Sequence, residues 1–168
     1  MIDINNNTAV VFPGQGSQII GMGADLYEKS SIAKDIFDEV DETLGRKLTD
    51  IVFSGSQEVL NKTENAQPAI TATSLACFSV FKDKFKDFTP SVTAGHSLGE
   101  YTSLSASNAL SISDTIRLVS ERGRLMQIAC DKNPGGMVAI IGMEIDVVEE
   151  VCRAVSYTHL RAHETIAN

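Results

Sequence analysis

A serine flanked by two glycines, in Gly95-His96-Ser97-Leu98-Gly99, most constrains what this chain can fold into. A short β-branched segment precedes the motif and a stretch of small and apolar residues follows it, which predicts a strand over 91–96 and a helix over 98–109. Glycines at the flanking positions allow a sharp turn without a Cβ clash, and the helix N-terminus directs free N–H groups toward the serine. The pattern favours a nucleophilic Ser97, with a tight turn around a structural serine as the alternative.

Strand-like and helix-like segments alternate along the rest of the chain, which predicts an α/β fold with parallel strand pairing. The apolar run 8–12 ends at Pro13-Gly14, as is typical of a buried strand followed by a turn. The long apolar stretch 67–85, with Pro68 near its start, predicts a central buried helix. Further predicted elements are a helix over 31–44 capped by Ser31, short helices over 48–53 and 57–61, a helix opening at Ser113, a strand over 137–141 and a helix over 146–154.

Length and charge exclude several classes of protein. With 168 residues, 43% of them hydrophobic, the chain is long enough for one domain with a core. A formal net charge of −8 argues against a general nucleic-acid or anionic-membrane surface. We identify no signal peptide and no apolar segment of membrane-spanning length, and therefore expect a cytoplasmic location. Three widely spaced cysteines (Cys77, Cys130, Cys152) indicate reduced, mostly buried thiols without a disulfide framework or metal site.

Four motifs occur together in a fixed order: Phe-Pro-Gly-Gln-Gly-Ser-Gln at 12–18, Glu-Asn-Ala-Gln-Pro-Ala at 64–69, the serine motif continued by Glu-Tyr to 101, and Ser-Glu-Arg-Gly-Arg-Leu-Met-Gln at 120–127. This set resembles the malonyl-CoA:acyl-carrier-protein transacylases of fatty-acid synthesis and the acyltransferase domains of polyketide synthases. The resemblance covers about residues 8–155 and corresponds to the N-terminal half of such proteins.

The resemblance implies a domain organisation. Residues 1–132 would form a truncated, hydrolase-like parallel-sheet acyltransferase subdomain, and residues 133–155, after the break at Asn133-Pro134-Gly135-Gly136, would begin a ferredoxin-like small subdomain. Residues 156–168 do not resemble the family, and we interpret them as a foreign tail of artefactual origin.

The resemblance also implies roles for individual residues. Ser97 would be the nucleophile, and the backbone N–H groups of Gln15 and Leu98 would form the oxyanion hole. Arg122 would bind the malonyl carboxylate through two parallel hydrogen bonds, and Gln67 would line the same site. Helical spacing alone would favour a solvent-exposed role for Arg122, and Gln67 could simply cap the turn before Pro68. The family context favours the binding role for both residues.

The general base is the missing component. In the family it is a histidine roughly 100 residues beyond the serine, and we assign none here, because His159 and His163 lie in the tail and His96 adjoins the serine across a sharp turn. We therefore expect this chain alone to be unstable and nearly inactive.

The expected partners are malonyl-CoA and acyl carrier protein, and the expected substrates are malonyl-CoA and the phosphopantetheine group. We expect no cofactor, no metal and no bound nucleic acid. A monomer is the default oligomeric state. A serine esterase or thioesterase of α/β-hydrolase type, or a non-catalytic carrier-protein-binding fragment, are the alternatives. The sequence leaves open whether the protein is a stand-alone enzyme or a synthase module, and whether it prefers malonyl or methylmalonyl groups.

Overall fold

The computed structural model describes residues 8–132 and 140–155. The chain divides into two compact units, Met1–Asn133 and Pro134–Asn168, and each is described by itself below.

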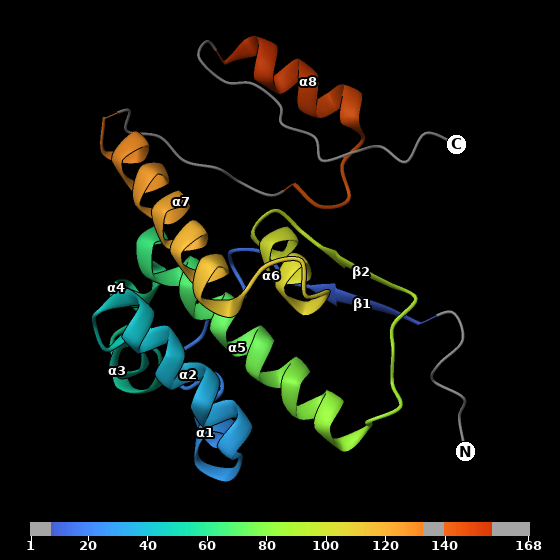
Figure 1. The fold of residues 1–168 in the computed structure, drawn as a ribbon. Helices are drawn as coiled ribbons and strands as arrows, with labels where there is room; N and C mark the ends of the chain where they lie inside the picture. Colours follow the sequence, from blue (N-terminus) through green and yellow to red (C-terminus); the bar gives the residue numbers. More distant parts are fainter. Residues whose placement is uncertain (1–7, 133–139, 156–168) are drawn as a thin grey trace. The chain divides into compact units, whose positions relative to one another are not determined.

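A two-stranded parallel sheet organises the first unit. Strand β1 (Ala9–Phe12) pairs with β2 (Val92–Gly95) in a register that sets Ala9 opposite Val92 and Phe12 opposite Gly95. Figure 1 shows the two strands side by side, next to helix α6 (Leu98–Ala106). Because parallel strands end at the same edge of a sheet, the loop after β1 and the turn after β2 are neighbours. The predicted parallel α/β pairing is confirmed for this pair.

The two faces of the sheet differ in burial. Phe12 is buried and meets the ring of Phe78 edge-on at 5.8 Å, so this face packs against the helices. Val11 on β1 is 71% exposed and Val92 on β2 is 54% exposed, and the register places both on the opposite face. Parallel sheets are normally covered on both faces. Within residues 8–132, the described part of the first unit, this sheet is covered on one face only.

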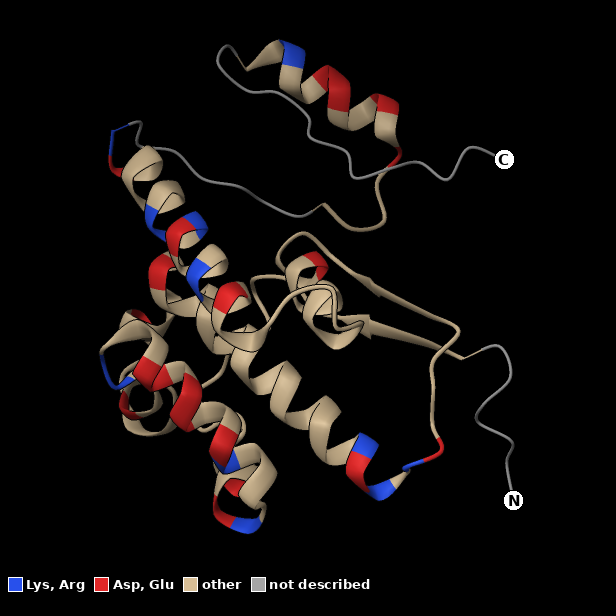
Figure 2. Cartoon of the chain, viewed as in Figure 1, with Lys and Arg blue, Asp and Glu red and all other residues tan. Residues whose placement is uncertain are grey.

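Helix α5 (Thr63–Lys84) forms the centre of the first unit. Figure 1 shows it between the helices α1 (Ala24–Lys29), α2 (Ser31–Leu44), α3 (Leu48–Ser54) and α4 (Gln57–Asn61) on one side and the sheet with α6 on the other. Charged residues of α5 lie only near its ends, whereas α2 carries several along its length (Figure 2). The main core cluster is composed of Ala33, Ile36, Phe37, Val40, Leu48, Val52, Leu60, Ala69, Ile70, Ala72, Leu75, Ala76, Leu98, Ile116 and Val119.

The central helix begins at Thr63, four residues before its predicted start at 67, and therefore contains Pro68 in its second turn. Proline has no N–H, so the carbonyl of Glu64, four residues earlier, loses its helical donor. Arg46 Nη2 donates to that carbonyl over 3.3 Å. A side chain from the α2–α3 connection thus supplies the missing hydrogen bond, which explains how the helix continues through a proline.

The helix predicted over 31–44 is confirmed, but its predicted cap and the predicted start of the helix at Ser113 were each wrong by one residue. Ser30, rather than Ser31, caps α2, because its Oγ accepts from the N–H of Ala33 over 3.4 Å. Helix α7 (Ile112–Lys132) begins before Ser113, since the Oγ of Ser111 accepts from the N–H of Asp114 over 3.0 Å. In both cases the serine immediately before the first helical residue satisfies a free helix N–H.

Two further predictions need correction. Helix α6 ends at Ala106, three residues before its predicted end at 109. Asn108, two residues after the last helical residue, has a positive φ of 61° and so does not continue the helix. The cysteines are not mostly buried: Cys77 and Cys130 are exposed and Cys152 is intermediate.

The described part of the second unit contains helix α8 (Ile145–Ala154), in agreement with the helix predicted over 146–154. Of the strand predicted over 137–141, residues 137–139 lie outside the described residues, and Ile140 and Ile141 are not in a strand. Among the described helices of both units, none has the length and apolar character needed to cross a membrane.

Candidate active site

Ser97 occupies the sharp turn between β2 and α6, as predicted. Its backbone has φ 53° and ψ −99°, a combination that non-glycine residues rarely adopt. The turn is held on both sides, because the N–H of His96 donates to the Phe12 carbonyl over 3.1 Å and the N–H of Gly99 donates to the His96 carbonyl over 2.9 Å. Strained backbone that the surroundings enforce in this way is common at functional sites.

The two glycines of the motif allow close approach of backbone segments. A Cβ on Gly95 would overlap the carbonyl group of Gly99, and a Cβ on Gly99 would overlap the carbonyl oxygen of Phe12. The positive φ of the turn lies at Ser97 and at neither glycine. The spacing of the motif therefore reflects the contact of β1, β2 and the first turn of α6.

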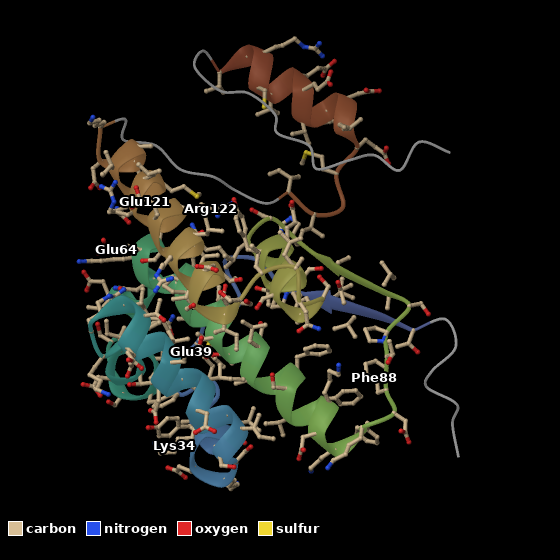
Figure 3. The ribbon with its side chains drawn as sticks, in the orientation of Figure 1. Lys34, Glu39, Glu64, Phe88, Glu121 and Arg122 are labelled. Atoms are coloured by element: carbon tan, nitrogen blue, oxygen red, sulfur yellow. The ribbon has the colours of Figure 1, made fainter. Side chains whose placement is uncertain are left out.

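Arg122 lies beside the serine. From α7 its Nη2 donates to Ser97 Oγ over 2.9 Å, and its Nη1 donates to Gln67 Oε1 over 2.6 Å. Its guanidinium carbon is 5.8 Å from the centre of the Tyr101 ring on α6. Figure 3 labels Arg122 on α7, together with the preceding residue Glu121. Three helices and the turn thus meet at one guanidinium group.

The close approach of α7 to the start of α5 positions Arg122. A Cβ on Gly123 would lie 2.6 Å from the carbonyl oxygen of Thr63, so only glycine fits there. The Thr63 N–H also donates to Gln127 Oε1 over 3.3 Å. Gln67 follows one turn later on α5 and is fully buried, at 0% exposure.

The loop after β1 adjoins the serine turn. Gly14 packs against His96, because a Cβ there would lie 2.6 Å from His96 Nδ1. Ser17 Oγ donates to the Gly14 carbonyl over 3.0 Å, and the exposed Gln15 donates from Nε2 to Thr63 Oγ1 over 3.3 Å. The structure thus brings the loop that carries Gln15 to the edge of the sheet where Ser97 lies.

Leu98 is the first residue of α6, where a backbone N–H has no acceptor within its own helix. Its side chain is fully buried in the core and fixes the helix start. Such an N–H next to a nucleophile is suited to stabilise negative charge on a reacting oxygen.

The other two arginines of α7 form ion pairs on the surface. Arg117 pairs with Asp114 and Arg124 with Glu121, and all four side chains are exposed. The hydrogen bonds between Arg124 and Glu121 lower the pKa of the Glu121 carboxyl and raise the pKa of the guanidinium. Arg122, by contrast, is half-buried and bonded to Ser97 and Gln67.

The sequence reasoning missed two contacts of the site. Met126 accepts a hydrogen bond from Gln67 Nε2, with 3.2 Å between nitrogen and sulfur, and Tyr101 flanks Arg122. Met126 lies four residues after Arg122 on the same helix, so its place on that face was a usable signal. Tyr101 lies four residues after Ser97, but no spacing rule relates it to Arg122.

The chain belongs to the acyl transferase domain family, which matches residues 9–158. Two curated relatives are malonyl CoA-acyl carrier protein transacylases. That of Bacillus subtilis (strain 168) is 49% identical over 143 residues, which is 85% of this chain and 44% of the relative. That of Haemophilus influenzae is 45% identical over 145 residues, which is 86% of this chain and 46% of the relative.

Solved structures agree with this assignment. An acyl-carrier-protein-S-malonyltransferase from Bartonella henselae superposes with a TM-score of 0.76 at 42% identity, covering 89% of this chain and 48% of that one. A malonyl-transacylase in complex with a type II polyketide-synthase acyl-carrier protein gives a TM-score of 0.80 at 40% identity, covering 92% of this chain and 50% of that one. The chain spans about half the length of the relatives it matches.

Proposed function

We propose that this chain is part of a cytoplasmic malonyl-CoA:acyl-carrier-protein transacylase and carries its nucleophile and its carboxylate-binding residue. The observation that carries the proposal is the 2.9 Å hydrogen bond from Arg122 to Ser97 Oγ, which joins a cation to a strained serine turn. The names of the relatives support malonyl-CoA as donor and acyl carrier protein as acceptor.

The proposed reaction proceeds by two acyl transfers. Ser97 Oγ attacks the thioester carbonyl of malonyl-CoA, a C–O bond forms, the C–S bond breaks, and the serine proton passes through a base to the leaving CoA thiolate. In the second half, the phosphopantetheine thiol of the carrier attacks the Ser97 ester, a C–S bond forms, the C–O bond breaks, and the thiol proton passes through the base to Ser97 Oγ. We assign no base among residues 8–132 or 140–155, so the base is expected from a part of the whole protein beyond them.

Backbone N–H groups would stabilise the tetrahedral intermediates. Leu98 supports this role through its position at the start of α6, and Gln15 through the place of its loop beside the serine turn. Each such donor contributes about 3–4 kcal/mol of transition-state stabilisation.

Arg122 would confer the preference for a dicarboxylic acyl group. Its planar guanidinium matches a carboxylate with two parallel hydrogen bonds. A hydrolase of neutral esters has no use for a half-buried cation 2.9 Å from its nucleophile, which disfavours the esterase alternative. The hydrogen bond to Ser97 Oγ also fixes the distance between Arg122 and the serine. A malonyl group whose carboxylate is bound by Arg122 would therefore present its thioester carbonyl to Ser97.

The experiment joins residues 1–155 of this chain to the segment of the Bacillus subtilis relative that lies beyond its matched residues. With malonyl-CoA and holo acyl carrier protein, the chimera is expected to transfer malonyl groups to the carrier thiol, and its Ser97→Ala variant is not. An esterase would release free malonate without a carrier. A non-catalytic fragment would bind the carrier and leave malonyl-CoA intact. Either result would overturn the proposal.

The unfused chain serves as the comparison. We propose that it transfers malonyl groups far more slowly than the chimera, because the described residues supply no assigned base and leave one sheet face open. Equal rates for the two proteins would contradict this part of the proposal.

A further inference from the structure

The amide of Gln67 is fixed in one orientation by the chemistry of Arg122. A guanidinium group only donates hydrogen bonds, so the Gln67 atom 2.6 Å from Arg122 Nη1 must be the oxygen. The amide nitrogen is consequently turned to the other side. Because Gln67 is 0% exposed, this nitrogen has no route to bulk water and depends on an acceptor within the protein.

Met126 provides that acceptor. Its Sδ lies 3.2 Å from Gln67 Nε2, and it is placed one helical turn after Arg122 on α7. A thioether is a weak acceptor, but a buried N–H without a partner is costly. The residues therefore form a chain of contacts from Met126 Sδ through the Gln67 amide and the Arg122 guanidinium to Ser97 Oγ.

We propose that Met126 is a positioning residue, which acts through Gln67 to hold Arg122 in the orientation that reaches Ser97 and receives the acyl carboxylate. The consequence for the carboxylate rests on the proposed function. Without the sulfur, Gln67 either leaves its amide nitrogen unsatisfied or flips and turns that nitrogen against the cation. The first outcome leaves a buried N–H without an acceptor and so destabilises the orientation in which Oε1 faces Arg122, and the second removes the acceptor that holds Nη1.

A packing role for Met126 is the competing explanation, since methionine often fills irregular gaps in cores. Leucine has a similar volume and lacks the sulfur, so Met126→Leu separates the two roles. A second set of variants carries Gln67→Met, which removes the amide. In these variants the sulfur of Met126 has no hydrogen bond to accept from residue 67, so its positioning role is absent. Met22, which also packs against the core, offers a matched Met22→Leu control.

The experiment titrates the chimera described above, whose unsubstituted form serves as wild type, with malonate and with acetate, following the Arg122 guanidinium by NMR. We expect wild type to bind malonate in preference to acetate, Met126→Leu to weaken malonate binding about three- to tenfold, and Met22→Leu to leave it unchanged. In the Gln67→Met background, Met126→Leu is expected to have no additional effect. Thermal unfolding of each variant, compared with wild type, identifies any loss of binding that comes from unfolding.

The outcomes separate this inference from the proposed function. If wild type binds malonate but Met126→Leu binds it equally well, or if the effect is the same in both backgrounds, the positioning role is wrong and the proposed function stands. If wild type does not bind malonate, the role of Arg122 in the proposed function fails, and this inference fails with it.

Discussion

Arg122 and Ser97, 25 residues apart in sequence, share a hydrogen bond of 2.9 Å between Nη2 and Oγ. Strand β2 and helix α6 set the position of the serine, and helix α7 sets the position of the arginine. A cation bonded directly to a candidate nucleophile is the main constraint that the structure adds to the sequence motifs.

Replacing Arg122 by lysine tests the need for a planar fork. Lysine keeps the charge but cannot form two parallel hydrogen bonds, so malonate binding to Arg122→Lys should weaken by about tenfold or more. Calorimetric titration of the chimera measures the affinity. Arg117→Lys, at an exposed position on the same helix, is the matched control and should bind as wild type does. Equal affinity of Arg122→Lys and wild type would show that charge alone suffices.

A methyl group at Gly95 should destabilise the whole first unit. The new Cβ would overlap the Gly99 carbonyl group, and both sides of that contact are backbone that cannot rotate away. We expect Gly95→Ala to lower the free energy of unfolding by about 3 kcal/mol or more, at the upper end of overpacking effects. Urea denaturation measures this quantity. Ala94→Ser, on the exposed side of the same strand, should change it by less than about 0.5 kcal/mol.

The contact between Arg46 and the Glu64 carbonyl should depend on Pro68. Arg46→Met is expected to lower the free energy of unfolding by about 1 kcal/mol, because the carbonyl loses its donor. In a Pro68→Ala background the restored N–H can donate to the same carbonyl, so the effect of Arg46→Met should largely disappear. Urea denaturation of the four proteins gives the coupling energy. Additive effects would mean that Arg46 stabilises the chain in another way.

The open face of the sheet should promote self-association. Val11 and Val92 lie on that face at 71% and 54% exposure. The double variant Val11→Thr/Val92→Thr keeps β-branched residues and adds hydroxyl groups, so it should stay monomeric at higher concentration without a lower unfolding temperature. Light scattering across a concentration series checks this. If variant and wild type associate equally, self-association does not occur through this face of the sheet.

The sequence predicted what depends on local pattern. The strand, turn and helix around Ser97, the strand predicted over 8–12 and the buried central helix all follow from short local patterns. The structure contains each of them, with the first strand at Ala9–Phe12. The proximity of Ser97, Gln67 and Arg122 was accessible only through the resemblance to a family, since no local pattern relates three residues on different elements.

Contacts between distant segments explain the remaining differences. Pro68 predicted a helix start, yet the helix begins earlier because Arg46, 22 residues before the proline, serves the freed carbonyl. Likewise, the orientation of the Gln67 amide depends on both Arg122 and Met126. Such side-chain hydrogen bonds leave no trace in hydrophobic periodicity or turn composition.

The central claim is that Ser97 carries the acyl group and Arg122 selects it, and mass spectrometry of the acylated protein tests it most directly. The chimera described above is incubated with malonyl-CoA or acetyl-CoA, weighed intact and mapped by proteolysis. We predict one malonyl group on Ser97, no adduct in Ser97→Ala, much less acetyl than malonyl adduct, and loss of that preference in Arg122→Ala. A malonyl group on another residue, or equal labelling by both thioesters in the unsubstituted chimera, would contradict the account.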